Sequence, residues 1–118
     1  MSIQRFGTTK RYSDSVVHSG TVYLVEVPAT ETGDIATQTQ SLLAGVERLL
    51  AQAGSDKSRL LMVTVYLADL ADYDGMNAIW DAWLPPDCAP TRACVQARLA
   101  RPGWRVEMAV VAATSIVS

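Results

Sequence analysis

The chain has 118 residues, of which 49% are hydrophobic and 19% are charged, a balance that favours one packed domain over 1–118 and excludes a disordered chain. The formal net charge is −2 and the basic residues are scattered, which argues against a nucleic-acid-binding surface because such surfaces depend on clustered positive charge. No apolar stretch is long enough for a membrane helix, and the N-terminal residues lack the apolar core of a secretory signal. We therefore expect a cytoplasmic location.

The first third of the chain predicts short strands. One strand is expected over about residues 3–8, and residues 15–27 are expected to form a hairpin. The hairpin turns at Ser19–Gly20, because glycine tolerates positive φ. A polar loop, PATETG, follows the hairpin.

Two helices and a central strand are predicted next. A helix is expected over about 34–53, where apolar residues recur at steps of three and four, with Asp34 as its cap and Gly54 at its end. The segment 59–70 is apolar at successive positions, which is typical of a central strand. The spacing then predicts a second helix over about 72–84, capped by Asp72 and ended by two prolines.

The last third of the chain predicts two more strands, over about 91–98 and 104–112. The predicted order is therefore β-β-α-β-α-β-β, an α+β sandwich of two helices on one sheet. Two helices cover only one face of such a sheet, yet strands 59–70 and 104–112 are apolar on both faces. Because an apolar face of that size is costly in water, we expect another copy of the chain to cover it.

Two charged residues stand within these apolar strands. Arg92 is the only charged residue in APTRACVQA, and Glu107 is the only acid in WRVEMAVVAA, where Val106 and Met108 flank it. If the last two strands form a hairpin, Arg92 and Glu107 face each other across it. The two side chains then either form a buried ion pair that neutralises itself, which seldom adds much stability, or serve a ligand. The residues alone leave both interpretations open.

Metal ligands and cofactor-binding side chains are scarce. Cys88, Cys94 and the single His18 fit no zinc motif, and both cysteines are expected to be free thiols in a cytosolic protein. Neither Lys10 nor Lys57 lies in an apolar segment of the kind that holds a Schiff-base lysine. We therefore predict no metal and no organic cofactor.

Three segments of the chain resemble the RidA (YjgF) family of reactive-intermediate deaminases. They are RYSDSVVHSGTVYL, GSDKSRLLMVTVYLADLADYDGMNAIWDAW and APTRACVQARLARPGWRVEMAVVAA. The likeness covers nearly the whole chain in register, and the segments around Arg92 and Glu107 are its most specific part. The resemblance implies a chorismate-mutase-like fold with two helices on one face of a mixed sheet, assembled as a homotrimer with ligand clefts between subunits. It also implies cofactor-free hydrolysis of enamines and imines, such as 2-aminoacrylate, to 2-keto acids and ammonia.

The same resemblance implies roles for individual residues. Arg92 corresponds to the arginine that grips the substrate carboxylate, for which a guanidinium fork is suited. Glu107 corresponds to the acid that positions water at the imine carbon and passes a proton to the leaving nitrogen. Cys94 lies where the family uses a backbone group, and without a histidine partner its thiol is not expected to be a nucleophile. Tyr12 and Asn77 match positions that line the family cleft, and Asn77 also fits an ordinary helix-surface amide.

One segment, LVEVP, departs from the family. Most relatives have a glycine where this chain has Glu26 and a small hydroxyl residue where it has Val25. A glycine there lets the backbone approach the ligand closely. If Glu26 points inward, it obstructs the pocket, competes for Arg92 and raises the pKa of at least one of the two acids, so that the pocket favours another ligand or none. If Glu26 points outward, the pocket stays open.

Two other functions stay open at this level. One is a non-catalytic trimer that binds a 2-keto or carboxylic acid through Arg92, as a sensor or partner module. The other is the RNA cleavage or translation inhibition also attributed to this family, against which the scattered basic residues and the acidic balance count. Tyr73, Trp80 and Trp83 share a helical stripe, which predicts core packing rather than a platform for stacking bases.

Overall fold

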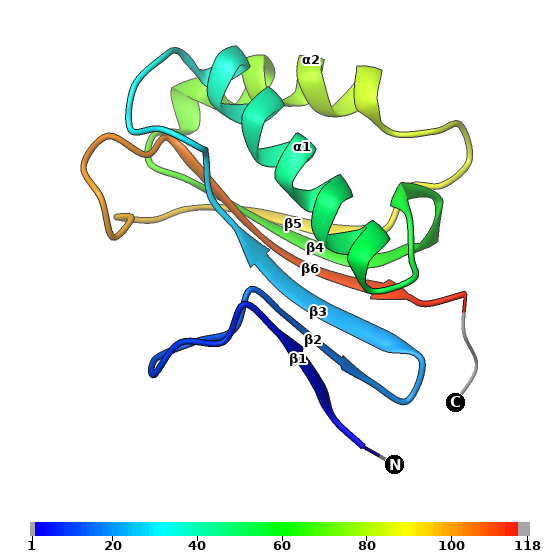
Figure 1. The fold of residues 1–118 in the computed structure, drawn as a ribbon. Coiled ribbons are helices and arrows are strands. Elements are labelled where there is room, and N and C mark those ends of the chain that lie inside the picture. The colour runs from blue at the N-terminus through cyan, green and yellow to red at the C-terminus, as the bar shows by residue number, and fades with distance from the viewer. Residues whose placement is uncertain (1, 116–118) are drawn as a thin grey trace.

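The computed structural model describes residues 2–115, which form a six-stranded sheet with two helices over one face (Figure 1). The strands are β1 (Gln4–Phe6), β2 (Ser15–His18), β3 (Thr21–Glu26), β4 (Leu60–Leu67), β5 (Thr91–Gln96) and β6 (Val106–Ala113). The helices are α1 (Ile35–Gln52) and α2 (Tyr73–Trp83), each next to a single 3-10 turn, η1 (Lys57–Arg59) or η2 (Leu70–Asp72). The predicted α+β sandwich is confirmed. No helix within residues 2–115 is long and apolar enough to cross a membrane.

The strands lie in the order β1-β2-β3-β6-β4-β5, so strands adjacent in space are often distant in the chain. All neighbours are antiparallel except β4 and β5, which are parallel and are joined through α2. The sheet is therefore mixed, as the family resemblance implies. The predicted order omitted one strand, because the hairpin over 15–27 contributes both β2 and β3. Its turn at Ser19 and Gly20, with φ of 52° and 78°, lies where it was predicted.

The prediction that the last two strands form a hairpin is wrong. β4 lies between them, pairing with β5 on one side and with β6 on the other. Arg92 is opposite Val63 of β4, whereas Glu107 is opposite Tyr66. The crossover through α2 places β5 at the sheet edge, and β6 then enters the gap between β3 and β4.

The helix ends lie where the sequence predicts them, with one exception in how α2 is capped. Asp34 caps α1, since its Oδ1 accepts the N–H of Thr37 at 2.8 Å, and Gly54 follows the last turn with a φ of 78°. α2 ends at Trp83, just before the two prolines. Asp72, the predicted cap of α2, makes no capping hydrogen bond, because its carboxylate lies 3.2 Å from the guanidinium of Arg105.

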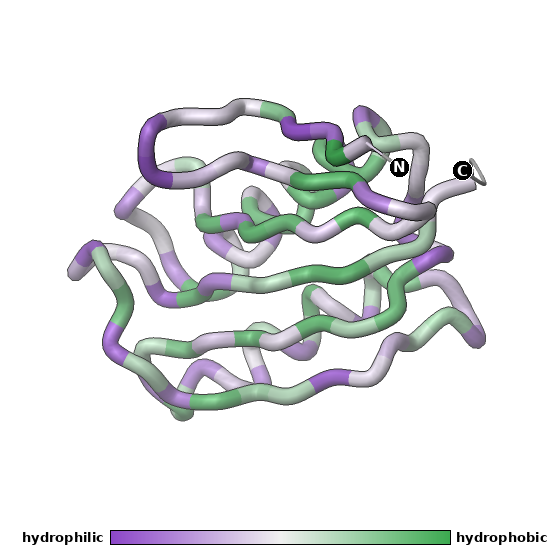
Figure 2. Tube along the Cα trace, turned by 90° about the horizontal axis from the view of Figure 1, so that it is seen from below, coloured by the Kyte–Doolittle hydropathy of each residue, from purple (hydrophilic) through white to green (hydrophobic). Residues whose placement is uncertain are grey.

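The two faces of the sheet differ in burial. Between the sheet and the helices lies a core of fully buried apolar side chains, among them Leu42, Leu50, Val63, Val65, Leu67, Met76 and Val106. The face away from the helices is apolar as well, but its side chains are about half exposed: Tyr23 48%, Val25 51%, Met62 48% and Val95 43%. Figure 2, which views the sheet from this side, shows hydrophobic residues along the central strands. The predicted apolar, uncovered face is confirmed.

Candidate functional site

Arg92 lies on the helix-covered side of the edge strand β5, beneath α2. Its guanidinium carbon is 5.3 Å from the centre of the Trp80 ring and 5.9 Å from that of Tyr73. One guanidinium nitrogen donates a long hydrogen bond, 3.5 Å, to the Tyr73 hydroxyl. Within residues 2–115 no carboxylate lies within 4.0 Å of this guanidinium. The two aromatic rings therefore hold the cation in place by cation–π contacts and leave its charge and most of its N–H donors unused.

Two further predicted site residues lie beside Arg92. Cys94 is two residues along β5 on the same side, where it packs against the core. Burial raises the pKa of the Cys94 thiol, with the nearby Arg92 cation opposing that shift, so the thiol stays protonated. Asn77 lies one turn from both Tyr73 and Trp80 on α2, so it shares their side of the helix. We call Arg92, Cys94, Asn77 and the two rings the arginine half-site.

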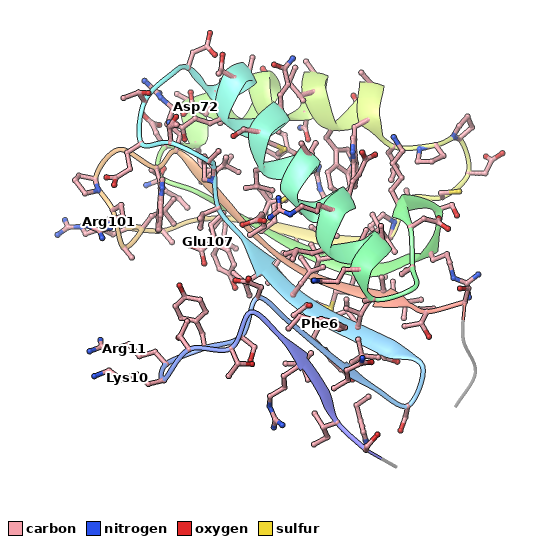
Figure 3. The ribbon with its side chains drawn as sticks, in the orientation of Figure 1. Phe6, Lys10, Arg11, Asp72, Arg101 and Glu107 are labelled. Atoms are coloured by element: carbon pink, nitrogen blue, oxygen red, sulfur yellow. The ribbon has the colours of Figure 1, made fainter. Side chains whose placement is uncertain are left out.

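Glu107 lies on the opposite, open side of the sheet. It lines a cavity of about 550 Å³ together with Tyr12, Asp14, Val25 and Trp104. Tyr12 comes from the loop between β1 and β2, where the N–H of Thr9 donates to the Tyr12 carbonyl at 2.7 Å. Figure 3 shows Glu107 between that loop and the loop before β6. We call these five lining residues the glutamate half-site.

Glu26 resolves the question raised by the LVEVP segment. It follows the parity of the buried Leu24, so its side chain points toward α1. One carboxylate oxygen lies 3.7 Å from Arg48 and the other accepts the N–H of Val27 at 3.1 Å. A methyl group at Gly45 would overlap with this carboxylate, so the Glu26 side chain would have to shift to make room for one. Burial raises the pKa of Glu26, with a smaller contribution from the negative charge of Asp14.

The prediction that Glu26 competes with a ligand for Arg92 is wrong for two residues of the same chain. Glu26 lies on β3, and both β6 and β4 lie between that strand and β5. Its carboxylate is withdrawn toward α1, although residue 26 itself still lines the cavity of the glutamate half-site. The cavity therefore stays open beside Glu107.

Within one chain the two half-sites cannot serve one small ligand. Arg92 faces the helices and Glu107 faces away from them, and the whole of β4 separates their strands. The structure thus brings Arg92 together with Cys94 and Asn77, and Glu107 together with Tyr12, and keeps the two groups apart. A ligand that contacts both Arg92 and Glu107 must lie between two copies of the chain.

Some residues of the site had not been predicted from the sequence. Trp104 and Asp14 line the cavity of Glu107, and Tyr73 and Trp80 hold Arg92 in addition to their predicted packing role. The signal for the two rings was their spacing on one side of α2, next to the strand that α2 precedes. No local pattern indicated Trp104, because its position depends on how the loop before β6 crosses the sheet edge.

Comparison with known proteins identifies the class to which this fold and these half-sites belong. The family described as Endoribonuclease L-PSP matches residues 2–114, and the chain belongs to this family, which is the RidA (YjgF) family. A crystal structure of a YjgF-family member from Neisseria meningitidis superimposes with a TM-score of 0.95 at 46% identity, covering 99% of this chain and 98% of that one.

Sequence comparison with curated relatives supports the same family. A RutC family protein of Haemophilus ducreyi is 46% identical over 112 residues, which cover 94% of this chain and 96% of that protein. The 3-aminoacrylate deaminase RutC of Acinetobacter baylyi is more distant, 32% identical over 102 residues that cover 85% of this chain and 80% of that enzyme. The predicted family is therefore confirmed.

Proposed function

We propose that the protein is a homotrimeric deaminase that hydrolyses reactive imines and enamines of the 2-aminoacrylate type to 2-keto acids and ammonia. The observation that carries the proposal is a guanidinium, Arg92, that is held by two aromatic rings and has no carboxylate partner within residues 2–115. A partly buried cation without a counter-ion is costly unless an incoming anion neutralises it. Membership of a family that includes a 3-aminoacrylate deaminase supports hydrolytic deamination as the general class of reaction.

The proposed trimer completes the active site. Its interface is the open, apolar face of the sheet, which would otherwise expose large side chains such as Tyr23 and Met62 to water. Cyclic assembly through this face places the arginine half-site of one subunit next to the glutamate half-site of its neighbour. The substrate then lies between Arg92 of one copy and Glu107 of the next.

The proposed mechanism begins with binding of the substrate carboxylate. The guanidinium of Arg92 donates two parallel hydrogen bonds to the two carboxylate oxygens, which fixes the orientation of the imine carbon. An enamine substrate first takes a proton at its terminal carbon and loses one from its nitrogen, and so becomes the imine. Arg92 keeps its charge at every physiological pH, so its grip does not depend on proton transfer.

Glu107 performs the hydrolytic step. Its carboxylate accepts a proton from a water molecule as the water oxygen forms a bond to the imine carbon, and the π electrons of the C=N bond move to nitrogen. The protonated Glu107 then gives that proton to the nitrogen. Glu107 then accepts the proton of the new hydroxyl group and passes it to the nitrogen as the C–N bond breaks, so that a keto acid and ammonia leave. One water is consumed for each ammonia released, so the reaction balances without another reactant.

The test uses an imine made in place by an amino-acid oxidase, with keto-acid release followed against time. Wild-type protein should accelerate release over the rate in buffer. Arg92→Ala should abolish the acceleration, because the substrate carboxylate loses its anchor. Glu107→Gln should reduce it about 100-fold or more, the usual contribution of a general acid–base.

Matched controls separate site effects from general charge effects. Arg11→Ala and Glu31→Gln change an exposed arginine and an exposed glutamate outside both half-sites, and both variants should keep the wild-type rate. If the wild-type protein leaves the buffer rate unchanged but still binds 2-keto acids through Arg92, the protein is a binding module and not a deaminase. RNA binding or cleavage would instead favour the alternative of RNA cleavage or translation inhibition.

A further inference from the structure

A second cavity lies on the other side of the loop that precedes β6. Its volume is about 400 Å³, and its lining includes Gln96, Arg98, Leu99, Arg101, Pro102 and Trp104. Trp104 and its loop separate this cavity from the glutamate half-site, since Trp104 lines both. Neither the RidA resemblance nor the proposed reaction gives this cavity a role.

The cavity carries positive charge that its lining does not neutralise. Arg98 and Arg101 both line it, and no acidic residue does. Neither arginine forms an ion pair within residues 2–115. Of the two acids at the adjoining η2 segment, Asp72 pairs with Arg105 and Asp69 accepts the N–H of Ala71 at 2.9 Å, and neither forms an ion pair with Arg98 or Arg101.

The walls of the cavity are fixed by hydrogen bonds. The loop begins where the N–H of Ala97 donates to Leu67 at 2.9 Å, and it ends where the N–H of Ala68 donates to Arg105 at 3.0 Å. Gln38, which is 2% exposed, crosses from α1 and holds the loop from within. Its amide donates to the Gly103 carbonyl at 2.9 Å and accepts the N–H of Arg105 at 2.8 Å.

The floor of the cavity is held as well. The side-chain oxygen of Gln96 accepts the N–H of Leu70 at 2.9 Å, which joins β5 to η2. The N–H of Trp104 donates to the Arg101 carbonyl at 3.2 Å and closes a turn. Because the backbone of this wall is already fixed, a ligand that binds here has to order only the exposed side chains of Arg98 and Arg101. Figure 3 shows Arg101 at the outer edge of this loop.

We propose that this cavity is a binding site for a small anion, a phosphate or carboxylate group, held between Arg98 and Arg101. Two guanidinium groups offer paired N–H donors that match the oxygens of such an anion, and the attraction adds to the hydrogen bonds. The Trp104 ring supplies an apolar wall and links the anion to the cavity of Glu107. The anion is either a free effector or the distal acidic group of a substrate whose reacting end lies at Glu107.

The binding test uses inorganic phosphate and the intact, isotope-labelled protein, with amide and indole N–H signals followed by NMR. The ionic strength is held constant with chloride, so that general screening does not change. We expect saturable shifts that concentrate on residues 97–104 and on the Trp104 indole. The paired variant Arg98→Ala/Arg101→Ala should weaken binding about tenfold or more, the usual effect of losing charge-assisted hydrogen bonds.

Two matched variants make the test specific. Arg11→Ala removes an exposed arginine from the β1–β2 loop and should leave the phosphate response unchanged. Arg92→Ala should leave it unchanged too, which separates this cavity from the proposed catalytic site. The proposal is overturned if phosphate gives no saturable shift, if the paired variant binds as wild type does, or if Arg92→Ala abolishes the response. None of these outcomes depends on deaminase activity.

A kinetic comparison then identifies the source of the anion, and this part rests on the proposed function. The wild type and the paired variant are compared on imines with one carboxylate and on imines with two. A loss of kcat/KM confined to the dicarboxylate imine assigns the cavity to the substrate's distal group. If added phosphate changes kcat/KM equally for both imines in the wild type and has no effect in the paired variant, the cavity binds a free effector. A paired variant that matches wild type in both comparisons overturns a functional role for the cavity.

Discussion

The two faces of the sheet have similar apolar strands but different neighbours. On the covered face, Val63, Val65 and Leu67 are almost completely buried under the helices. On the open face, Tyr23 and Met62 remain about half exposed, at 48% each. An apolar face of this extent is costly in water, which is why the proposed trimer uses the open face as its interface.

The two charged residues of the proposed site also lie on different faces of the sheet. Arg92 lies on the covered face, where Tyr73 and Trp80 shield it, and Glu107 lies on the open face in its own cavity. Each face thus contributes one half of the proposed chemistry. A single chain holds both halves without being able to use them together.

The largest expected effect comes from placing a charge on the open face. Met62→Lys would bury an unpaired ammonium in the proposed interface, so we expect the trimer to dissociate into folded monomers. Light scattering coupled to size-exclusion chromatography measures the mass, and circular dichroism checks that the secondary structure remains. Gln40→Lys, on an exposed position of α1, is the control and should stay trimeric. A Met62→Lys protein with the wild-type mass contradicts the role of this face.

Truncating a buried side chain tests how tightly the covered face is packed. Leu67 is fully buried beneath the helices, so Leu67→Ala should lower the free energy of unfolding by about 3 kcal/mol through lost burial and the cavity left behind. Urea unfolding at one fixed protein concentration gives the value. A loss below about 1 kcal/mol would show that the covered face is less tightly packed than described.

Gln38 tests the polar contact that joins the helix layer to the loop before β6. Gln38→Leu leaves the Gly103 carbonyl and the Arg105 N–H without their buried partner, so the free energy of unfolding should fall by about 2 kcal/mol. Gln40→Leu changes an exposed glutamine on the same helix and should have almost no effect. Equal stability of the two variants would mean that water replaces the Gln38 contacts.

The smallest effect is a pH dependence at Glu26. Burial raises its pKa in the folded protein above the ordinary value of 4.5, despite the pairing with Arg48. The folded state therefore binds more protons at this group than the unfolded state, and its contribution to stability is lost as the pH rises through the folded pKa.

Glu26→Gln removes this titration. Relative to wild type, the variant should become more stable as the pH rises from below 4.5 toward neutrality, with the change complete above the folded pKa. Thermal or urea unfolding across that interval measures the difference. A difference between the two proteins that stays constant with pH would show that the folded and unfolded pKa values are the same.

Local features of the fold could be predicted from the sequence because they depend on near neighbours. The periodicity of α1, its Asp34 cap and the turn at Ser19–Gly20 all act within a few residues. The apolar character of both faces of β4 also placed that strand in the interior of the sheet. The orientation of Glu26 could have been predicted too, because it shares the parity of the buried Leu24.

The rest depended on contacts between distant segments. The pairing of the last two strands was wrong because adjacency in the chain does not fix adjacency in a sheet once a helical crossover intervenes. Asp72 does not cap α2 because Arg105, far along the chain, takes its carboxylate. The separation of Arg92 from Glu107 followed from the same crossover. Their roles stay predictions, carried by the family resemblance and by the surroundings of each side chain.

Subunit complementation tests the central claim most directly. The Arg92→Ala protein, which we expect to be inactive, and the Glu107→Gln protein, which we expect to be about 100-fold or more slower than wild type, are unfolded together in equal amounts and refolded. In a cyclic trimer, each mixed assembly joins one intact Arg92 to one intact Glu107, so about a quarter of wild-type activity should return. The double variant Arg92→Ala/Glu107→Gln, refolded with Arg92→Ala, should recover none. Mixed trimers that form but show only the residual activity of the parents would contradict an active site shared between subunits.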